Sequence, residues 1–407
     1  MKSHCRWYGD SRMTRIALMP SSYLPSLGGV EELTRNLAVA LSASGHQVEV
    51  WTPTADATSS PETETLDSIV VRRFPMPLPA RSLRALANLP AGALRAGLHI
   101  RKALKDFAPD VIDVICFGPN GVYGTLAAVL TGVPLVVSLQ GETQMDDHDI
   151  FDKSAFMRYS LRRSFGSASA VTACSRCTLD DAVARFGLTP GLGEVVYNGV
   201  DTSLVPQAAG AGRAIAALET ALGSRPYVAA VGRVVEKKGF DLLARAFAEI
   251  ADEFDDTDLV IGGEGRAIGE LKDLVASLGL SGRVHLPGRL TREEVASLLT
   301  GSQVFVVPSR YEPFGIVVLE GWRAGVPVLA TSRGGPAELI STGYDGVLAD
   351  PFDTAAMAQS LRSLLRDPDR SRSIAEAGKR RVKDFDWALV EKHYAQIYDR
   401  VAKQKAP

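Results

Sequence analysis

Cysteines, long apolar runs and an excess of one charge are all scarce in this sequence. Four cysteines among 407 residues are too few for a disulfide framework in a chain of this length. No apolar run approaches the ~18 residues of a membrane-spanning helix, and the N-terminus has no apolar segment of the signal-peptide kind. The net charge of −2 gives no general attraction to nucleic acid. These absences predict a cytoplasmic protein in a reducing setting that does not bind nucleic acid.

The sequence also lacks a recognisable metal site. Cys174 and Cys177 form a lone C-x-x-C spacing, and a zinc site would need a second pair of ligands that the chain does not supply at a suitable distance. We interpret the pair as two small residues at a strand-to-helix turn. We expect no bound metal and no bound cofactor.

Short apolar runs alternate with helical patterns along most of the chain. In the first half, the predicted strands are 15–19, 47–51, 69–73, 111–115, 135–139, 170–173 and 194–196. In the second half, they are 227–231, 259–261, 284–286, 304–307, 326–330 and 346–349. This alternation is typical of a parallel sheet with helices on both faces. The fold class predicted is α/β, with two doubly wound, Rossmann-like domains.

A stretch rich in Ala, Gly and Pro interrupts the alternation near the middle of the chain. The expected organisation is a disordered extension at 1–13, an N-terminal domain at 14–201, a junction at 202–225, a C-terminal domain at 226–385 and a final helical segment at 386–407. Open α/β sheets bind ligands beyond the carboxyl ends of their strands. The ligands are therefore expected in a cleft between the two domains.

The stretch from Val306 to Gly321 is the most informative part of the sequence. It contains two carboxylates eight positions apart, Glu312 and Glu320, with a turn between them and a short helix that carries Glu320 about two turns along. Free N–H groups at a helix N-terminus attract phosphate, and carboxylates suit the hydroxyls of a sugar and a ribose. The stretch therefore predicts a binding site for a nucleotide sugar.

Further motifs accompany this stretch in a fixed order along the chain. They are Gly28-Gly29-Val30-Glu31, Asn198-Gly199-Val200-Asp201, Gly232-Arg233 with Lys237-Lys238-Gly239, Gly262-Gly263-Glu264-Gly265, Gly334-Gly335-Pro336-Ala337-Glu338 and Phe385-Asp386-Trp387. Together with the two spaced glutamates, they resemble family four of the retaining glycosyltransferases (glycosyl transferases group 1), which have the GT-B fold. The resemblance covers roughly residues 14–400, and it implies that the C-terminal helix crosses back onto the first domain.

The resemblance implies roles for the charged residues of the second domain. Glu320 is similar to the ribose-binding glutamate of the family, and Glu312 to the carboxylate that holds the donor sugar's hydroxyls. Arg233 and Lys238 follow a predicted strand and a glycine, where a diphosphate would meet fixed positive charge. Lys237 is the competing lysine, but Lys238 directly precedes the glycine and aligns better.

Backbone groups are expected to bind the rest of the donor. Phe314, Gly315 and Ile316 would offer N–H groups to the distal phosphate. Gly28 and Gly29 would let the opposing loop approach the same phosphate, because no Cβ intervenes. In addition, Gly263 and Glu264 follow a predicted strand, and we expect them to line the pocket of the base.

One segment departs from the family pattern. Family members commonly carry a histidine after the strand that here ends at Leu139, and this chain has Gln140 or Glu142 in its place. Gln140 can still hydrogen-bond a donor-sugar hydroxyl, whereas Glu142 can accept a proton or orient an acceptor hydroxyl. His148 is a weak substitute on position alone. The departure affects the acceptor side more than the donor site.

The function predicted is a retaining transfer of sugar from a nucleoside diphosphate sugar, expected to be UDP-linked, to the hydroxyl of a sugar, lipid or metabolite. The resemblance implies that the second domain binds the donor and the first the acceptor. It also implies front-side attack, with the leaving diphosphate taking the proton, and no metal requirement. Two alternatives remain: a GT-B sugar-nucleotide epimerase and a non-catalytic nucleotide-sugar-binding protein.

The segment 81–105 is basic, with six arginines and lysines and no acid before Asp106. Leucine and alanine separate the charges. One interpretation is the solvated face of a helix in a Rossmann-type domain. The other is an amphipathic surface for an anionic acceptor or for peripheral contact with the inner face of a membrane.

Overall fold

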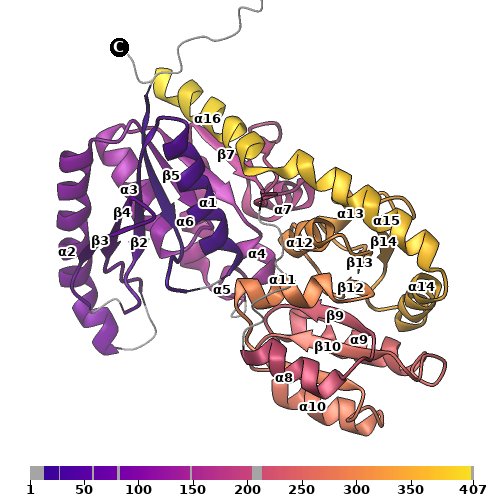
Figure 1. Ribbon diagram of the computed structural model, residues 1–407. Helices are drawn as coiled ribbons and strands as arrows, with labels where there is room; N and C mark the ends of the chain where they lie inside the picture. Colours follow the sequence, from indigo (N-terminus) through magenta and orange to yellow (C-terminus); the bar gives the residue numbers. More distant parts are fainter. Residues whose placement is uncertain are drawn as a thin grey trace, which may run out of the picture. The chain divides into compact units, whose positions relative to one another are not determined.

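The computed structural model describes residues 13–26, 28–56, 59–79, 83–146, 149–203 and 213–404. The chain divides into two compact units, and each contains its own sheet (Figure 1). Unit 1 comprises Met1–Cys174, Leu179–Val196 and Trp387–Pro407, and unit 2 comprises Ser175–Thr178 and Tyr197–Asp386. The extension expected at residues 1–13 lies outside the described residues, except for Met13.

Unit 1 is built on an eight-stranded sheet in the order β3-β4-β2-β1-β5-β6-β7-β8. Its strands are β1 (Arg15–Pro20), β2 (Gln47–Pro53), β3 (Glu62–Leu66), β4 (Ile69–Phe74), β5 (Val111–Ile115), β6 (Leu135–Leu139), β7 (Ala170–Ala173) and β8 (Gly193–Val195). Neighbouring strands are parallel, except that β3 runs antiparallel to β4. The strand order reverses between β1 and β5, which is where doubly wound sheets bind ligands.

Helices cover both faces of this sheet. They are α1 (Gly29–Ala43), α2 (Leu83–Phe107), α3 (Pro119–Thr131), α4 (Glu142–Met145), α5 (Ile150–Lys153), α6 (Ala155–Phe165), α7 (Arg176–Phe186) and α16 (Trp387–Lys403). Alternate residues of β1 face opposite cores: Ala17 and Met19 pack with α2, α3, α6 and α7, whereas Ile16 and Leu18 pack with α1 and α16. Figure 1 shows α16, in yellow, beside α1, in indigo.

A buried polar cluster fixes the C-terminal helix to the sheet of unit 1. The Tyr398 hydroxyl of α16 donates to Asp113 Oδ2 of β5 at 2.6 Å, and the Ser138 hydroxyl of β6 donates to Oδ1 at 2.8 Å. Nearby, the Thr14 hydroxyl donates to Asp399 at 2.8 Å. Burial raises the pKa of Asp113 to about 6, while the hydrogen bonds from Tyr398 and Ser138 act against this rise. The helix therefore contributes polar as well as apolar contacts to the core.

Unit 2 has a six-stranded parallel sheet in the order β11-β10-β9-β12-β13-β14. Its strands are β9 (Tyr227–Val231), β10 (Asp258–Gly262), β11 (Val284–Gly288), β12 (Val304–Val307), β13 (Val328–Thr331) and β14 (Val347–Ala349). The remaining elements are α8 (Arg213–Leu222), η1 (Glu236–Lys238), α9 (Phe240–Ala248), α10 (Ile268–Ser277), α11 (Arg292–Thr300), α12 (Ile316–Ala324), α13 (Pro336–Leu339), α14 (Thr354–Arg366), α15 (Pro368–Arg381) and η2 (Val382–Phe385). One large apolar core joins α9, α10, α14 and α15 to this sheet.

Two elements lie where the sequence predicted none. The strand β3 is short, alternates Glu and Thr, and lies at the edge of its sheet, so it carries little of the apolar signal of a strand. The helix α8 occupies part of the stretch expected as a junction. Its Ala214 N–H donates to Glu294, which also forms a capping box with Thr291 at the start of α11. In the described part of the chain, no helix is long and apolar enough to cross a membrane.

Candidate functional site

The carboxyl ends of β9 and β12 form the switch point of the unit 2 sheet, because β10 and β11 extend to one side and β13 and β14 to the other. The chain that leaves β9 forms η1 and ends it at Lys238, and the chain that leaves β12 carries Glu312. Lys238 Nζ lies 2.7 Å from Glu312 Oε2. Two predicted site residues, far apart in sequence, therefore meet at this edge of the sheet.

Glu312 is held in one position by its neighbours. The Ser309 hydroxyl donates to Glu312 Oε2 at 2.8 Å, and the backbone N–H of Glu312 donates to the carbonyl of Arg333 at 3.1 Å. The side chain is buried, with 7% of the residue exposed. The sequence reasoning did not single out Ser309, although a hydroxyl three residues before a glutamate in the same turn was a signal that could have identified it.

Glycines allow the loops beyond these strand ends to pack backbone against backbone. Gly239 ends η1 with φ of 68°, and a Cβ there would lie 2.1 Å from the carbonyl oxygen of Pro308. Gly263 follows β10 with φ of 140°, and its Cβ would lie 1.9 Å from the carbonyl oxygen of Gly232. Both positions exclude any side chain, so backbone groups of three strand ends lie close together there.

The helix α12 begins directly after the turn that follows Glu312. Gly315 adopts φ of 96° and ψ of 55° as its N-cap, and the helix starts at Ile316. The N–H groups of the first helical turn have no partner within a helix and carry the positive end of its dipole. Phe314 is buried and stacks on Tyr197, with 6.0 Å between the ring centroids, so its ring has a packing role and its backbone is the part that can meet a ligand.

Glu320 lies in the second turn of α12 and is half-buried. Burial raises the pKa of Glu320, while the positive charges of Arg323 and Arg292 act against this rise. Arg292 comes from the start of α11, and no motif in the sequence pointed to it. The carboxylate is thus in a partly apolar setting with two cations near enough to affect it.

Arg233, Gly263 and Glu264 lie at the same edge of the sheet, just beyond β9 and β10. Arg233 and Glu264 are exposed, and Gly263 is half-buried. The Val234 N–H donates to the carbonyl of Glu264 at 2.8 Å, which links the two loops. The predicted donor residues of unit 2 therefore all belong to loops or helix starts beyond the carboxyl ends of β9, β10 and β12.

In unit 1, Glu142 ties together the loops that follow β5 and β6. Its Oε1 accepts the Phe117 N–H and its Oε2 accepts the Gln140 N–H, both at 2.7 Å. Burial raises the pKa of Glu142, although these hydrogen bonds act in the opposite direction. Because each oxygen accepts a backbone N–H, the geometry favours a loop-holding role over the acid or base role considered from the sequence. Gln140 itself is half-buried directly after β6.

Gly28 and Gly29 lie at the start of α1, after β1. Gly28 is extended, and a Cβ there would lie 2.7 Å from Glu31 Oε2. The Glu31 carboxylate also accepts a hydrogen bond from the Ser22 hydroxyl. Internal packing is therefore one reason for a glycine at position 28. His148, the weak substitute for the family histidine, lies outside the described residues.

The C-x-x-C pair has the positions expected of small residues at a strand-to-helix turn. Cys174 directly follows β7, and Cys177 lies in the first turn of α7. Within the ranges that the structure describes, no cluster of three or more His, Cys, Asp and Glu side chains could hold a metal ion.

Comparisons with known proteins match both halves of the chain to glycosyltransferases. The family model described as glycosyl transferases group 1 matches residues 216–381, and that of glycosyltransferase family 4 matches residues 27–204. A glycogen synthase of Mycobacterium tuberculosis is 30% identical, and the match covers 94% of each chain. Sucrose-phosphate synthase from Thermosynechococcus elongatus has a TM-score of 0.79 at 23% identity, over 96% of this chain and 100% of the other. HepE from Anabaena, in complex with UDP and glucose, has a TM-score of 0.74 at 23% identity, over 95% and 100%.

Proposed function

Because this chain belongs to the glycosyl transferases group 1 and has the GT-B fold, we propose that it transfers a sugar from a UDP-sugar to an acceptor hydroxyl with retention of anomeric configuration. The observation that carries this proposal is the Lys238–Glu312 pair at the switch point of unit 2, beside the start of α12. A cation, a carboxylate and a helix N-terminus at one place suit a sugar diphosphate better than any single-charge ligand.

Lys238, Arg233 and the first turn of α12 would bind the diphosphate. Hydrogen bonds to charged groups contribute about 1.5–3 kcal/mol each, and guanidinium groups can contact two phosphate oxygens at once. Negative charge on the diphosphate grows as the bond to the anomeric carbon breaks. Fixed cations and dipoles aimed at that charge stabilise the transition state more than the bound substrate, and this is the main catalytic contribution proposed for the protein.

The two glutamates of this site would bind the hydroxyls of the donor. Glu312 is already fixed by Lys238 and Ser309, so it loses little conformational freedom when it accepts hydrogen bonds from the sugar. Glu320 would accept hydrogen bonds from the ribose. Gly263 and Glu264 would lie along the base. The choice of UDP is supported by HepE, which was solved with UDP and glucose and shares the fold.

Unit 1 would supply the acceptor side of the reaction, with a sugar, lipid or metabolite hydroxyl as the attacking group. Gly28 and Gly29 are proposed to contact the distal phosphate through bare backbone. Gln140 cannot take a proton, so the proton of the attacking hydroxyl would pass to the phosphate oxygen that leaves on the same face of the sugar. Front-side attack of this kind retains the anomeric configuration and needs no base at position 140 or 142.

A donor screen followed by product analysis tests the proposal. We expect UDP-sugars to raise the melting temperature more than GDP- or ADP-sugars, since a ligand at 100 times its Kd stabilises by about 2.7 kcal/mol. Glu312→Gln should reduce this shift. NMR of the product should show the anomeric configuration of the donor.

Four other results would each contradict the proposal. If no nucleotide sugar raised the melting temperature, the proposed donor site would be wrong. A product with inverted anomeric configuration would exclude retention. Release of an epimerised sugar nucleotide would favour the epimerase alternative. Tight binding with neither transfer nor hydrolysis across an acceptor panel would favour the non-catalytic alternative.

A further inference from the structure

Three helices of unit 1 form a continuous layer on one face of its sheet. The buried sides of α2, α3 and α6 all pack into the same core, and α3 contacts both of the others. The Thr125 hydroxyl of α3 and the Ser164 hydroxyl of α6 are hydrogen-bonded at 2.7 Å, which fixes those two helices side by side. The outer side of this layer is called here the α2–α3–α6 face.

The composition of α3 does not match its position on the surface. Its sequence, PNGVYGTLAAVLT, contains no charged residue, yet its outer side exposes Leu126, Val129 and Leu130. Leu130 has 74% of its surface exposed. A helix that is apolar all round normally lies in a protein core or in lipid, since a surface helix has a polar outer side. The outer side of α3 therefore indicates contact with an apolar environment and not with water alone.

Both neighbouring helices extend this apolar surface. On α2, Leu94 and Leu98 are exposed one turn apart, opposite the side that carries Ala96 and Ile100 into the core. On α6, Phe156 and Tyr159 are likewise exposed. The α2–α3–α6 face thus contains seven large exposed apolar side chains on three helices: Leu94, Leu98, Leu126, Val129, Leu130, Phe156 and Tyr159. Contiguous patches of this kind mark interaction sites.

The charge of the three helices has one sign. Their sequences contain eight arginines and lysines against one acid, Asp106, while the chain as a whole has a net charge of −2. On α2, Arg101 and Lys105 lie on the same outer side as the exposed leucines, whereas Lys102 forms an ion pair with Asp106 at 3.0 Å. The side chains of Arg81 and Arg84, in the basic segment noted from the sequence, lie outside the described residues.

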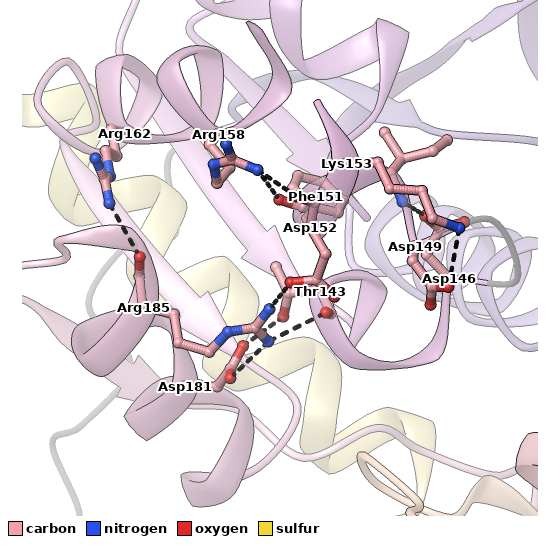
Figure 2. A network of polar contacts seen from close by, with 11 residues as sticks. Thr143, Asp146, Asp149, Phe151, Asp152, Lys153, Arg158, Arg162, Asp181 and Arg185 are labelled. Carbon is pink, nitrogen blue, oxygen red and sulfur yellow. Dashed lines mark hydrogen bonds and ion pairs between the residues drawn. The ribbon is translucent and has the colours of Figure 1, made fainter. Parts of the chain in front are cut away.

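Basic side chains pair with the acids next to α6, so these acids offset only a small part of this charge (Figure 2). Arg185 of α7 forms ion pairs with Asp152 and Asp181, and Lys153 forms one with Asp149 at 3.2 Å. Arg158 donates to the carbonyls of Phe151 and Asp152, which fixes α5 against α6. These ion pairs set two cations against three carboxylates, so they offset most of the local negative charge, and the basic residues of α2 and α6 outnumber the one acid that remains.

We propose that the α2–α3–α6 face lies on an anionic lipid bilayer, with the apolar side chains at the boundary of the headgroups and the basic side chains against lipid phosphates. An apolar centre with basic neighbours is the composition of surface-bound helices, and it suits anionic lipid better than an uncharged protein partner. The inference does not depend on the proposed sugar transfer, because it concerns where the chain lies and not what it binds beyond its strand ends.

Vesicle sedimentation of the full chain tests this proposal. The probes are vesicles of phosphatidylcholine with or without phosphatidylglycerol, at low and high salt. At low salt, we expect the chain to bind the anionic vesicles much more strongly than the uncharged ones, and at high salt we expect a weaker binding through the apolar side chains to persist. Each basic residue near such a surface changes partitioning about fivefold, so Arg101→Glu with Lys105→Glu should weaken binding at least about twentyfold. Leu126→Glu with Leu130→Glu should remove the binding that persists at high salt.

Matched controls lie on the opposite face of the same sheet. Leu389 and Lys392 are exposed on α16, and Leu389→Glu with Lys392→Glu should leave vesicle binding within twofold of the original chain. All variants should keep their far-UV circular dichroism and their donor hydrolysis in solution. If the original chain does not sediment with anionic vesicles, or if the α16 pair weakens binding as much, the proposal is wrong. It is also wrong if the α3 pair changes the molar mass in solution, because a second copy of the chain then covers this face.

Discussion

Glu142, Glu312 and Glu320 have side chains in three different environments, and those environments separate their roles. Glu312 is paired with a lysine and a serine, Glu320 is half-buried within the influence of two arginines, and Glu142 accepts backbone N–H groups on both oxygens. A carboxylate whose partner is a lysine side chain can exchange that partner for a ligand. A carboxylate that accepts two backbone N–H groups cannot exchange them for a ligand without leaving these buried donors unpaired.

Lys238 should contribute to turnover, whereas Lys237 should not. We expect Lys238→Ala to lower turnover by about two to three orders of magnitude, as for the loss of one donor to a charged transition state. Lys237→Ala is the matched control, one residue away, and should stay within a few-fold of the original chain. Both are assayed well below the melting temperature, because removing Lys238 also leaves buried Glu312 without its cation. Normal kinetics in folded Lys238→Ala would make this lysine structural.

Glu320→Gln should weaken donor binding without unfolding the chain. Loss of a charged hydrogen-bond acceptor corresponds to about 1.5–3 kcal/mol, or roughly 10- to 150-fold in Kd. Burial raises the pKa of Glu320 above its ordinary value of 4.5, so this carboxylate becomes protonated while the pH is still above 4.5. Donor affinity should therefore fall as the pH drops toward 4.5. Calorimetric titration across this range should show that fall in the original chain and a flatter profile in Glu320→Gln. Glu270→Gln, on the exposed side of α10, is the control, and equal losses in both variants would refute the ribose role.

At the scale of elements, the sequence predicted the strands that are apolar and buried, and it did not predict the strand that is polar and exposed. All thirteen predicted strands lie within two residues of observed strands, because buried parallel strands consist of continuous apolar residues. The strand that was missed, β3, alternates Glu and Thr at an edge of its sheet. The helix α8 was missed within an Ala- and Gly-rich stretch. The site residues could be predicted because they follow strands, but one partner of Glu142, the Phe117 N–H, comes from another loop that no spacing rule indicates.

The connection between the loops after β5 and β6 depends on Glu142. Glu142→Gln replaces one acceptor oxygen with an NH₂ group, which leaves a buried backbone N–H without an acceptor and should cost about 1–3 kcal/mol of stability. Gln140→Ala is the control, because its backbone N–H still donates to Glu142. It should keep the melting temperature while lowering turnover. Thermal unfolding measures the stability of both variants, and an assay of donor turnover measures their activity. An unchanged melting temperature with a shifted pH–rate profile in Glu142→Gln would instead restore the acid or base role.

The docking of α16 on the sheet should depend on pH through Asp113. Its folded pKa of about 6 lies above the ordinary value of 3.8, so the folded state binds the proton more tightly. The resulting stabilisation, up to about 3 kcal/mol, is fully present below pH 3.8 and is lost as the pH rises to about 6. Asp113→Asn should remove the part of the fall in the free energy of unfolding that is due to this titration. Urea unfolding at several pH values from 4 to 7 compares the two slopes, and identical slopes would contradict the prediction.

At the scale of the whole molecule, the chain stabilises two bodies separately although it passes between them more than once. Among the described residues, each hydrophobic core draws its members from a single unit, and the last helix of the chain belongs to unit 1. Unit 2 contains the residues proposed to bind the donor's diphosphate, sugar and ribose, except Gly28 and Gly29, which belong to unit 1. Unit 1 contains Gln140, Glu142 and the α2–α3–α6 face. A destabilising substitution in one core should therefore lower the stability of that unit before it affects the other.

A pair of core variants, one in each unit, tests this separation. Tyr398→Phe removes a donor from buried Asp113 in unit 1, at a cost of about 1–3 kcal/mol. In unit 2, Gly378→Ala would put a Cβ 2.3 Å from the buried ring of Trp322, and such overpacking costs about as much. Hydrogen–deuterium exchange should show lost protection in β1, β5 and α16 for the first variant, and in β12, α12 and α15 for the second. If either variant lowers protection equally in both units, the two cores unfold together and the α16 anchor stabilises the whole chain.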